Sequence, residues 1–159
     1  MTLLLKNILF TVLLPGTVTV AVPYLILSGR SAGATWPTDT WLWLGTVPVA
    51  LGTGVLLRCV WDFAVTGRGT PAPVDPPREL VVRGLYRYVR NPMYVGVLSI
   101  LLGEALFFRS TALLIYAAGF LLTVHLFVLL YEEPVLRRKF GESYQRYCRT
   151  VNRWLPRKP

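Results

Sequence analysis

The chain has 159 residues, of which 53% are hydrophobic and only 16% are charged, and its formal net charge is +9. Soluble domains carry roughly 25% charged residues, so this composition excludes an ordinary soluble domain and indicates an integral membrane protein. The basic residues flank apolar segments, which favours contact with lipid headgroups and argues against nucleic-acid binding. The length predicts one domain, with two membrane helices in residues 1–65 and a loop, a helical hairpin and a tail in residues 66–159.

Four apolar stretches approach the about 20 residues that a membrane-spanning helix needs. They cover residues 8–27, 41–65, 94–108 and 111–131. The first is longer than the about 7–15-residue core of a signal peptide, so we expect an uncleaved helix. The third is short, and we expect it to begin near Pro92, because proline suits the first turn of a helix. The sequence therefore predicts an all-α membrane protein with about four transmembrane helices.

The basic residues predict the orientation of these helices. Lys and Arg gather in the loop 65–91 and in the tail after Pro134, whereas the other two connections hold one arginine each, Arg30 and Arg109. Basic loops stay in the cytoplasm, so both termini and the long loop are predicted on the cytoplasmic side. Residues 66–77 are rich in Gly and Pro, which exclude a continuous helix, and are expected to form an ordered crossing loop or a lid.

The tail has an apolar face at helical spacing and a polar face opposite to it. The apolar face consists of Phe140, Tyr144, Tyr147, Cys148 and Val151, and the polar face of Glu142, Arg146 and Arg149. This pattern predicts an amphipathic cytoplasmic helix at the C-terminus. Such a helix either anchors the protein on the bilayer surface or covers a site at the ends of the spans.

Two clusters of charge meet at the cytoplasmic end of the predicted hairpin. Residues 90–94 (Arg-Asn-Pro-Met-Tyr) open the third apolar helix, and Glu132-Glu133 close the fourth, with the turn at Arg109-Ser110. Counting at 1.5 Å per residue from that turn places Glu132 level with about Tyr88. Charge at a membrane boundary is costly unless it is used, so we treat this end of the hairpin as the candidate site.

The same counting predicts neighbours for the acidic pair. Glu132 and Glu133 are expected near Arg87 and Arg90, and His125 one to two turns deeper, near Tyr94. Arg90 against Glu132 or Glu133 is either a structural ion pair or a site for a zwitterionic ligand, because arginine suits a carboxylate and glutamate an ammonium group. His125 is either a buried, hydrogen-bonded histidine or a catalytic base.

Three further features of the apolar helices support local predictions. Arg58 and Asp62 are four residues apart on one helix face and are expected to neutralise each other. Gly96 and Gly103 suit close helix packing. No Cys or His spacing typical of a metal site occurs, so no metal is predicted.

The two clusters resemble those of the isoprenylcysteine carboxyl methyltransferases and the related phospholipid methyltransferases. The family pattern is Arg-His-Pro-x-Tyr, a hydrophobic stretch and then Glu-Glu, which corresponds to residues 90–94 and 132–133 here. The preceding Gly84-Leu85-Tyr86 and the later Phe140-Gly141 also match, so the resemblance covers about residues 77–156. It implies a membrane methyltransferase that uses S-adenosylmethionine.

By this resemblance, eight residues correspond to cofactor-binding positions: Leu80, Val81, Tyr86, Asn91, Pro92, Met93, Tyr94 and Glu132. The catalytic candidates are Arg90, Glu133 and His125, and Arg87 is a candidate for binding the acceptor's acidic group. The chain departs from the family pattern twice. Asn91 replaces the histidine of the motif, and Val128 replaces an arginine that binds the substrate carboxylate in the eukaryotic prenylcysteine enzymes, which argues against a prenylcysteine substrate more than against the cofactor.

The predicted function is therefore methyl transfer from S-adenosylmethionine to a lipophilic acceptor, either the carboxylate of an isoprenoid-like compound or a lipid headgroup. The cofactor would enter from the cytoplasm and the acceptor from the bilayer. Two alternatives stay open. A membrane reductase using NADPH is one, because sterol reductases carry a similar Arg-His-Pro-x-Tyr element, although they are normally much longer. A non-catalytic membrane scaffold, in which the Arg–Glu pair only holds the hairpin, is the other.

Overall fold

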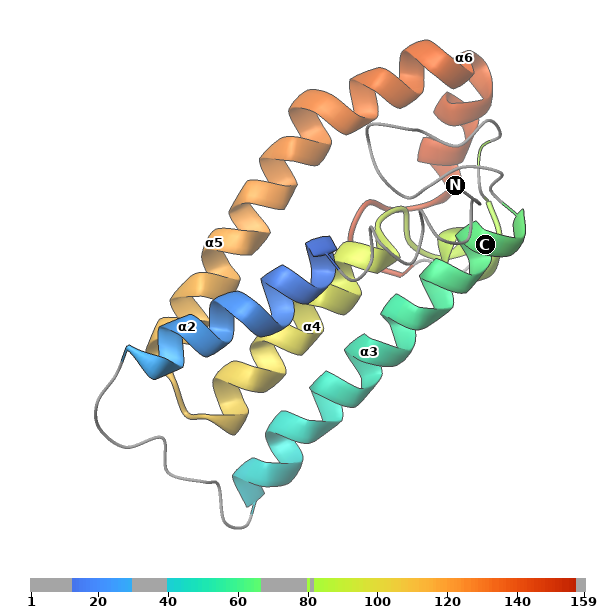
Figure 1. Cartoon of the computed structure of the whole chain (residues 1–159). Helices are drawn as coiled ribbons and strands as arrows, with labels where there is room; N and C mark the ends of the chain where they lie inside the picture. Colours follow the sequence, from blue (N-terminus) through green and yellow to red (C-terminus); the bar gives the residue numbers. More distant parts are fainter. Residues whose placement is uncertain (1–12, 30–39, 67–79, 81, 157–159) are drawn as a thin grey trace.

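The computed structural model of the protein describes residues 13–29, 40–66, 80 and 82–156. This part of the chain is helical, with short turns and a single isolated bridge between Val89 and Asn152. In chain order the elements are η1 (Thr17–Ala21), α2 (Val22–Ser28), α3 (Thr40–Thr66), η2 (Gly84–Arg87), α4 (Pro92–Phe107), α5 (Thr111–Phe127), η3 (Val128–Glu132) and α6 (Glu133–Thr150) (Figure 1). The all-α prediction is confirmed for these residues, and residues 67–77 of the predicted crossing loop lie outside them.

Two helices are long and apolar enough to cross a membrane, Leu42–Asp62 and Thr111–Thr150, and Leu13–Ser28 and Pro92–Phe107 are shorter apolar helices. In each of the two long helices only 22% of the most apolar stretch is buried inside the protein. Large apolar side chains such as Ile115 therefore face outward. Exposed apolar surface on this scale is typical of a region that lipid covers.

Glycines bring α3 and α4 into close contact. A Cβ atom on Gly52 would lie 2.5 Å from the carbonyl oxygen of Gly96, and one on Gly103 would lie 2.7 Å from that of Gly45. No side chain fits at these distances, so the two backbones approach each other directly, as in other small-residue helix interfaces. The predicted packing role of Gly96 and Gly103 is confirmed, and their partners on α3 are identified.

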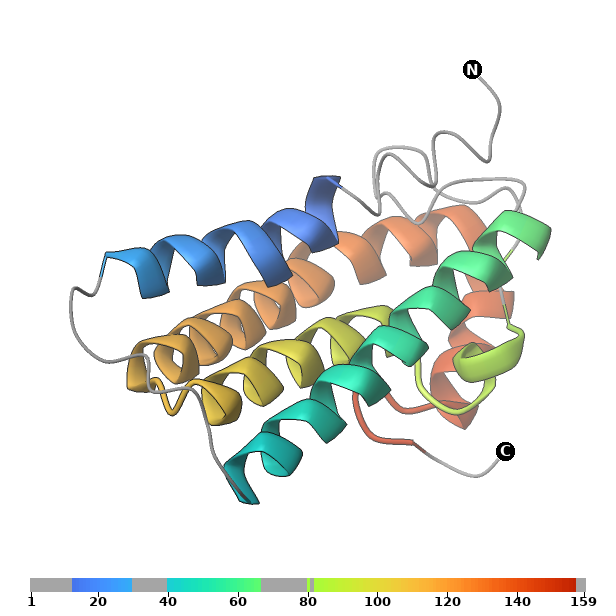
Figure 2. The ribbon, with the colours of Figure 1, turned by 60° about the horizontal axis from the view of Figure 1, so that its bottom comes forward.

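The helical hairpin of α4 and α5 turns where the sequence predicts. Arg109 adopts a positive φ of 49°, and the Ser110 hydroxyl accepts a hydrogen bond from the Leu113 amide at 3.3 Å, which caps the start of α5. The N-terminal segment lies beside α5 (Figure 2), and the Tyr116 hydroxyl donates a hydrogen bond to the Val18 carbonyl at 3.0 Å. The buried core between these helices consists of Leu56, Val97, Ile100, Leu101 and Ala117.

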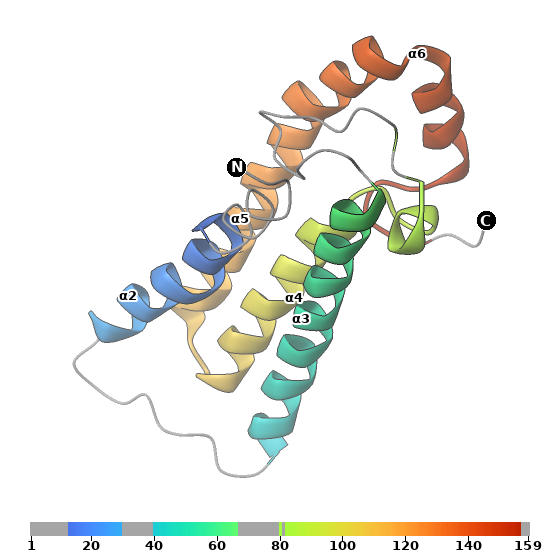
Figure 3. The same cartoon turned by 45° about the vertical axis from the view of Figure 1, so that its right-hand side comes forward.

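The last helix doubles back toward the start of α4. The segments α5, η3 and α6 follow one another without a break until Gly141, whose φ of 53° interrupts α6 and turns the chain (Figure 3). Beyond the turn Tyr144, Tyr147 and Val151 are buried and pack with Leu80. The apolar face that the sequence places on this helix is thus directed at the segment before α4.

Candidate functional site

The segment that leads into α4 is fastened to the C-terminal tail. The Tyr147 hydroxyl donates a hydrogen bond to the Tyr86 carbonyl at 2.6 Å, the Arg90 amide donates to the Asn152 carbonyl at 2.9 Å, and the Asn91 side-chain amide donates to the Arg153 carbonyl at 3.2 Å. Burial raises the pKa of the Tyr86 hydroxyl well above its usual value, so this tyrosine remains protonated. These three hydrogen bonds hold the backbone of residues 86–91 in place at the start of the motif.

Glu133 is the centre of a cluster of three arginines. Its buried carboxylate accepts two hydrogen bonds from Arg153, at 2.7 and 3.1 Å, and forms ion pairs with Arg90 at 3.1 Å and Arg137 at 3.7 Å. Arg90 also donates to the Cys148 sulfur at 2.8 Å. Of the two pairings that the sequence leaves open for Arg90, the structure has the one with Glu133. Charges buried in this way are strongly coupled, and each depends on its partner.

The neighbouring Glu132 has different surroundings. Its carboxylate accepts a hydrogen bond from the Tyr94 hydroxyl at 3.1 Å. Among the residues that the structure describes, no arginine, lysine or histidine lies within ion-pair distance of it. The two adjacent glutamates thus differ in kind, since Glu133 is neutralised by the protein and Glu132 is not.

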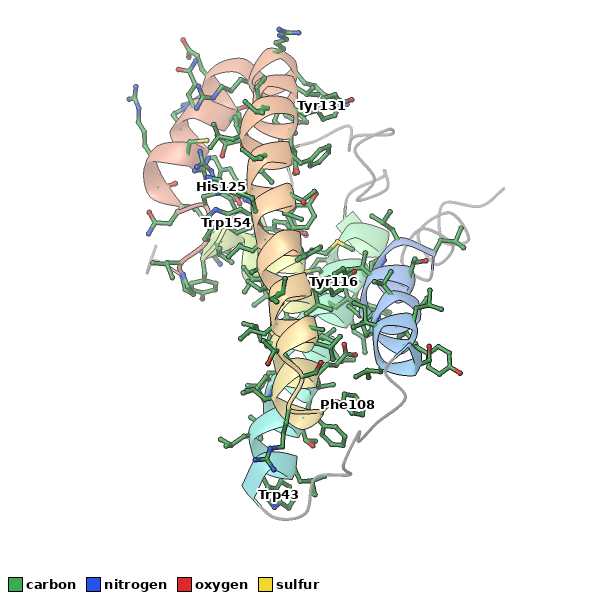
Figure 4. The ribbon with its side chains drawn as sticks, turned by 90° about the vertical axis from the view of Figure 1, so that its left-hand side faces the viewer. Trp43, Phe108, Tyr116, His125, Tyr131 and Trp154 are labelled. Carbon is green, nitrogen blue, oxygen red and sulfur yellow. The ribbon has the colours of Figure 1, made fainter. Side chains whose placement is uncertain are left out.

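His125 has a partner in the C-terminal tail. The indole N–H of Trp154 donates a hydrogen bond to His125 Nδ1 at 3.1 Å, and the two rings lie together near the cluster end of the bundle (Figure 4). Because an indole nitrogen only donates, Nδ1 must be the accepting nitrogen of the imidazole. In the neutral ring the proton is then on Nε2, and neither nitrogen has a free lone pair. This geometry favours the structural role of the two roles considered for His125.

An apolar cavity of about 320 Å³ lies between the N-terminal segment, α4 and α5. Its lining is almost entirely hydrocarbon and aromatic, and the Tyr94 side chain that hydrogen-bonds Glu132 is part of it. The other lining residues are Leu14, Pro15, Val18, Met93, Val97, Phe120, Thr123, Val124 and Phe127. Tyr94 therefore links the two features, since its side chain lines the apolar cavity and its hydroxyl donates to the Glu132 carboxylate.

The remaining predicted site residues are distributed around this centre. Pro92 is fully buried in the first turn of α4, as predicted, and Met93 packs against both the Cys59–Tyr86 cluster and the helix core. Leu80 packs against the returning helix. Val81 lies outside the described residues. Arg87 corrects a prediction, since it is exposed and lines a different, polar pocket with Arg58 instead of lying beside Glu133.

The predicted depth of the acidic pair was also wrong. Glu132 lies beside Tyr94, whereas counting from the hairpin turn puts it beside Tyr88. The counting assumes two straight, untilted α-helices. In the structure α4 begins only at Pro92, and residues 128–132 adopt the wider π-helical form, which rises less per residue. Figure 3 shows α5 and α6 continuing past the start of α4.

Sequence reasoning missed the part of the cluster that comes from α6 and the tail. The missed residues are Arg137, Cys148, Arg153 and Trp154. Arg137 could have been found, because it lies four residues after Glu133, on the same helix face. The other three reach the cluster only through the reversal at Gly141. No spacing in the sequence indicates the direction of that turn.

Fold and site together define a class: a helical membrane protein in which charged groups at one end of a helical hairpin adjoin an apolar cavity. Residues 40–143 match the phospholipid methyltransferase family. The match covers more than half of the chain, so the protein belongs to this family. It begins earlier than the resemblance recognised from the motifs, because it includes all of α3, and it ends before Arg153.

A relative from Haemophilus influenzae, described as an uncharacterized protein, is 36% identical over 63 residues. These residues make up 40% of the present chain and the whole length of that relative. No solved structure matches the chain significantly.

Proposed function

We propose that the protein transfers a methyl group from S-adenosylmethionine to a lipophilic acceptor in the membrane. Family membership supports a membrane methyltransferase. The observation that carries the proposal further is the contrast between the two glutamates. Glu133 has three cationic partners, whereas Glu132 has none in the described part of the chain and is bonded to a tyrosine that lines an apolar cavity.

The charged groups fit the amino-acid part of this cofactor. Glu132 is the acceptor for its ammonium group, because a carboxylate that no cation of the protein neutralises favours an incoming one. Arg90 is the donor for its carboxylate. The Nε–H of Arg90 is buried and, in the described part of the chain, lacks a hydrogen-bond partner, which is costly unless a ligand satisfies it. Leu80, Val81, Tyr86 and residues 91–94 complete the proposed binding site.

When bound, S-adenosylmethionine would supply an electrophilic methyl group on a positively charged sulfonium. Transfer would form a bond from the acceptor's nucleophile to that methyl carbon, break the S–CH3 bond and leave the neutral thioether S-adenosylhomocysteine. The protein's part is to position the two reactants and to exclude water. Tyr94 contributes to both tasks, since its hydroxyl donates a hydrogen bond to Glu132 and its side chain lines the apolar cavity. The aliphatic and aromatic side chains of α4, α5 and the N-terminal segment hold the apolar part of the acceptor.

The surroundings of the predicted bases support an acceptor that is already a nucleophile. An ammonium acceptor must lose a proton before it attacks, whereas a carboxylate is ready at neutral pH. The Glu133 carboxylate is occupied by three arginines, and His125 accepts from Trp154 through its one lone pair. Neither is free to take a proton, so we propose a carboxylate-bearing lipophilic acceptor ahead of an amine headgroup.

The membrane arrangement that we propose has four spans, with both termini and the charged cluster on the cytoplasmic side. The concentration of arginine and lysine in the loop 65–91 and in the tail supports this orientation. In this arrangement the two shorter apolar helices, Leu13–Ser28 and Pro92–Phe107, cross the membrane together with the residues that flank them. Fusions of a periplasm-active and a cytoplasm-active reporter to the C-terminus measure the orientation, and activity of the periplasmic reporter alone would rule it out.

Calorimetry on the detergent-purified protein tests the proposed function. We expect S-adenosylhomocysteine to bind and NADPH not to bind. Binding of NADPH alone would indicate a reductase, and binding of neither would indicate a scaffold. Glu132→Gln should weaken S-adenosylhomocysteine binding about tenfold to 100-fold, because one charge-assisted hydrogen bond contributes about 1.5–3 kcal/mol.

Two controls sharpen this experiment. Glu142→Gln removes an equal charge from the exposed face of α6 and should leave the affinity unchanged. Circular dichroism of each variant establishes that the helices are intact. Wild-type affinity in a folded Glu132→Gln variant would show that Glu132 does not hold the ligand's ammonium group.

A further inference from the structure

A second pocket, polar and separate from the apolar cavity, lies at the end of the bundle that carries the Glu133 cluster. It measures about 530 Å³ and is formed where the last turns of α3 meet the segment around η2. Figure 3 shows this short helix beside the end of α3. The residues that matter for its chemistry are Arg58, Trp61, Asp62, Arg83, Gly84 and Arg87.

The pocket has an excess of positive charge. Its three guanidinium groups face a single carboxylate, that of Asp62, which pairs with Arg58 at 3.2 Å. Arg83 and Arg87 are exposed, and neither has an ion pair with any residue in the described ranges. Two guanidinium groups are therefore available to an anion, and guanidinium suits the paired oxygens of phosphate or carboxylate.

One wall of this pocket is fixed by a glycine. Gly84 has a φ of 54°, and a Cβ atom there would collide with the Asp62 Oδ2 atom. The side chain of Asp62 is only 8% exposed, so it lies beneath the turn and holds Arg58 from there. The same turn carries Tyr86 into the core against Cys59. Arg83 and Arg87 thus flank a turn that packs on Asp62 and Cys59 of α3.

The position of the pocket indicates where its ligand comes from. It lies at the end of the candidate span Leu42–Asp62, whose outward face carries Leu57 and Trp61, each 62% exposed. Tryptophan is enriched at the level of lipid headgroups. An anion that reaches the arginines from this side passes along apolar surface, which is the situation of a phospholipid and not of a soluble ion.

We propose that this pocket binds the phosphate of an anionic phospholipid headgroup, with its acyl chains along Leu57 and Trp61. A zwitterionic headgroup fits less well, because the one carboxylate among the described lining residues, that of Asp62, pairs with Arg58 through Oδ1, and its Oδ2 atom is buried against Gly84, out of reach of an ammonium group. The proposal does not depend on methyl transfer. It assigns Arg83 and Arg87 to a lipid site beside the turn that positions Tyr86.

Native mass spectrometry of the full-length protein in a neutral detergent tests this proposal. The probes are a short-chain phosphatidylglycerol, the corresponding phosphatidylcholine and inorganic phosphate. We expect the phosphatidylglycerol to bind, and the double variant Arg83→Gln/Arg87→Gln to bind it about 30-fold more weakly, since each arginine near the surface contributes about a factor of five. The matched control, Arg146→Gln/Arg149→Gln on the exposed face of α6, should bind as the wild type does.

Several results would overturn the proposal. An equal loss in the control variant would mean that only the overall charge attracts the lipid. Equal binding of phosphatidylcholine would remove the preference for an anionic headgroup. Saturation by inorganic phosphate without any preference for the lipid would assign the pocket to a soluble anion. Thermal unfolding of each variant, followed by circular dichroism, excludes misfolding as the cause of a loss.

Discussion

Arg153 donates two parallel hydrogen bonds to Glu133, at 2.7 and 3.1 Å, and so joins the end of the described chain to the first turn of α6. The hydrogen bond to Glu133 raises the pKa of Arg153, as expected where the charged form is stabilised. Glu133 holds Arg90 by the same carboxylate. The Glu133 side chain, at the start of α6, therefore connects the segment before α4 to the C-terminal tail.

Replacing Glu133 should destabilise the protein. In Glu133→Gln the Arg90 side chain, which is only 12% exposed, keeps its charge and loses its counter-ion. Breaking a buried pair from one side costs about 3–5 kcal/mol, and thermal unfolding in detergent measures the loss. Arg137→Gln is the control, because Arg137 is 59% exposed and its pair should contribute less than about 1 kcal/mol. Equal stability of the two variants would contradict a structural role for the cluster.

Replacing His125 by asparagine should leave methyl transfer largely intact. The asparagine carbonyl oxygen can accept the Trp154 hydrogen bond, but asparagine cannot act as a base. We expect turnover within a few-fold of the wild type, measured with a radiolabelled methyl donor and a native lipid extract. A fall of about 100-fold or more in a folded variant would be the signature of lost general-base catalysis, and would restore the catalytic role of His125.

Two glycines of α3 should respond in opposite ways to the same change. In Gly52→Ala the new Cβ would lie 2.5 Å from the Gly96 carbonyl oxygen, so the helices must separate, at a cost of about 1–3 kcal/mol. In Gly54→Ala the new Cβ has no neighbour within 4 Å. There alanine should stabilise the helix by about 0.5–1 kcal/mol. Unfolding midpoints that shift in the same direction would argue against the close α3–α4 contact.

Filling the apolar cavity should impair the acceptor and spare the cofactor. Val18 lines the cavity, whereas Val20, on the same segment, is 67% exposed. We expect Val18→Phe to lower kcat/KM for the lipophilic acceptor about tenfold or more, as lost apolar contacts of a few kcal/mol imply. Affinity for S-adenosylhomocysteine should be unchanged, and Val20→Phe should behave as the wild type. A parallel loss of both ligands would place the cofactor in this cavity.

Local patterns in the sequence predicted a large part of the fold. Long apolar runs predicted α3 and α5, and the polar Arg109-Ser110 break predicted the hairpin turn. The pairing of Arg58 with Asp62 followed from a spacing of four residues on one helix. Each of these features depends on residues close in sequence, and helix geometry alone relates them.

The pairing within the charged cluster could not be predicted in the same way. The sequence predicted that Arg90 and the two glutamates lie at one end of the hairpin, but it left open which glutamate pairs with Arg90. Counting from the hairpin turn assumes straight α-helices, whereas residues 88–91 precede α4 and residues 128–132 form a π-helical turn. The level of each side chain along the hairpin therefore differs from the counted one, and so does its partner.

The sequence by itself therefore determined that this is a helical membrane protein of a methyltransferase family, because periodicity, hydropathy and motif spacing are properties of neighbouring residues. Only the tertiary structure decided that Glu133 is neutralised by three arginines, while Glu132 accepts a hydrogen bond from Tyr94. The physical reason is that two of those arginines, Arg90 and Arg153, come from distant parts of the chain. Their distance to the carboxylate depends on how the helices tilt and on where the last one turns back.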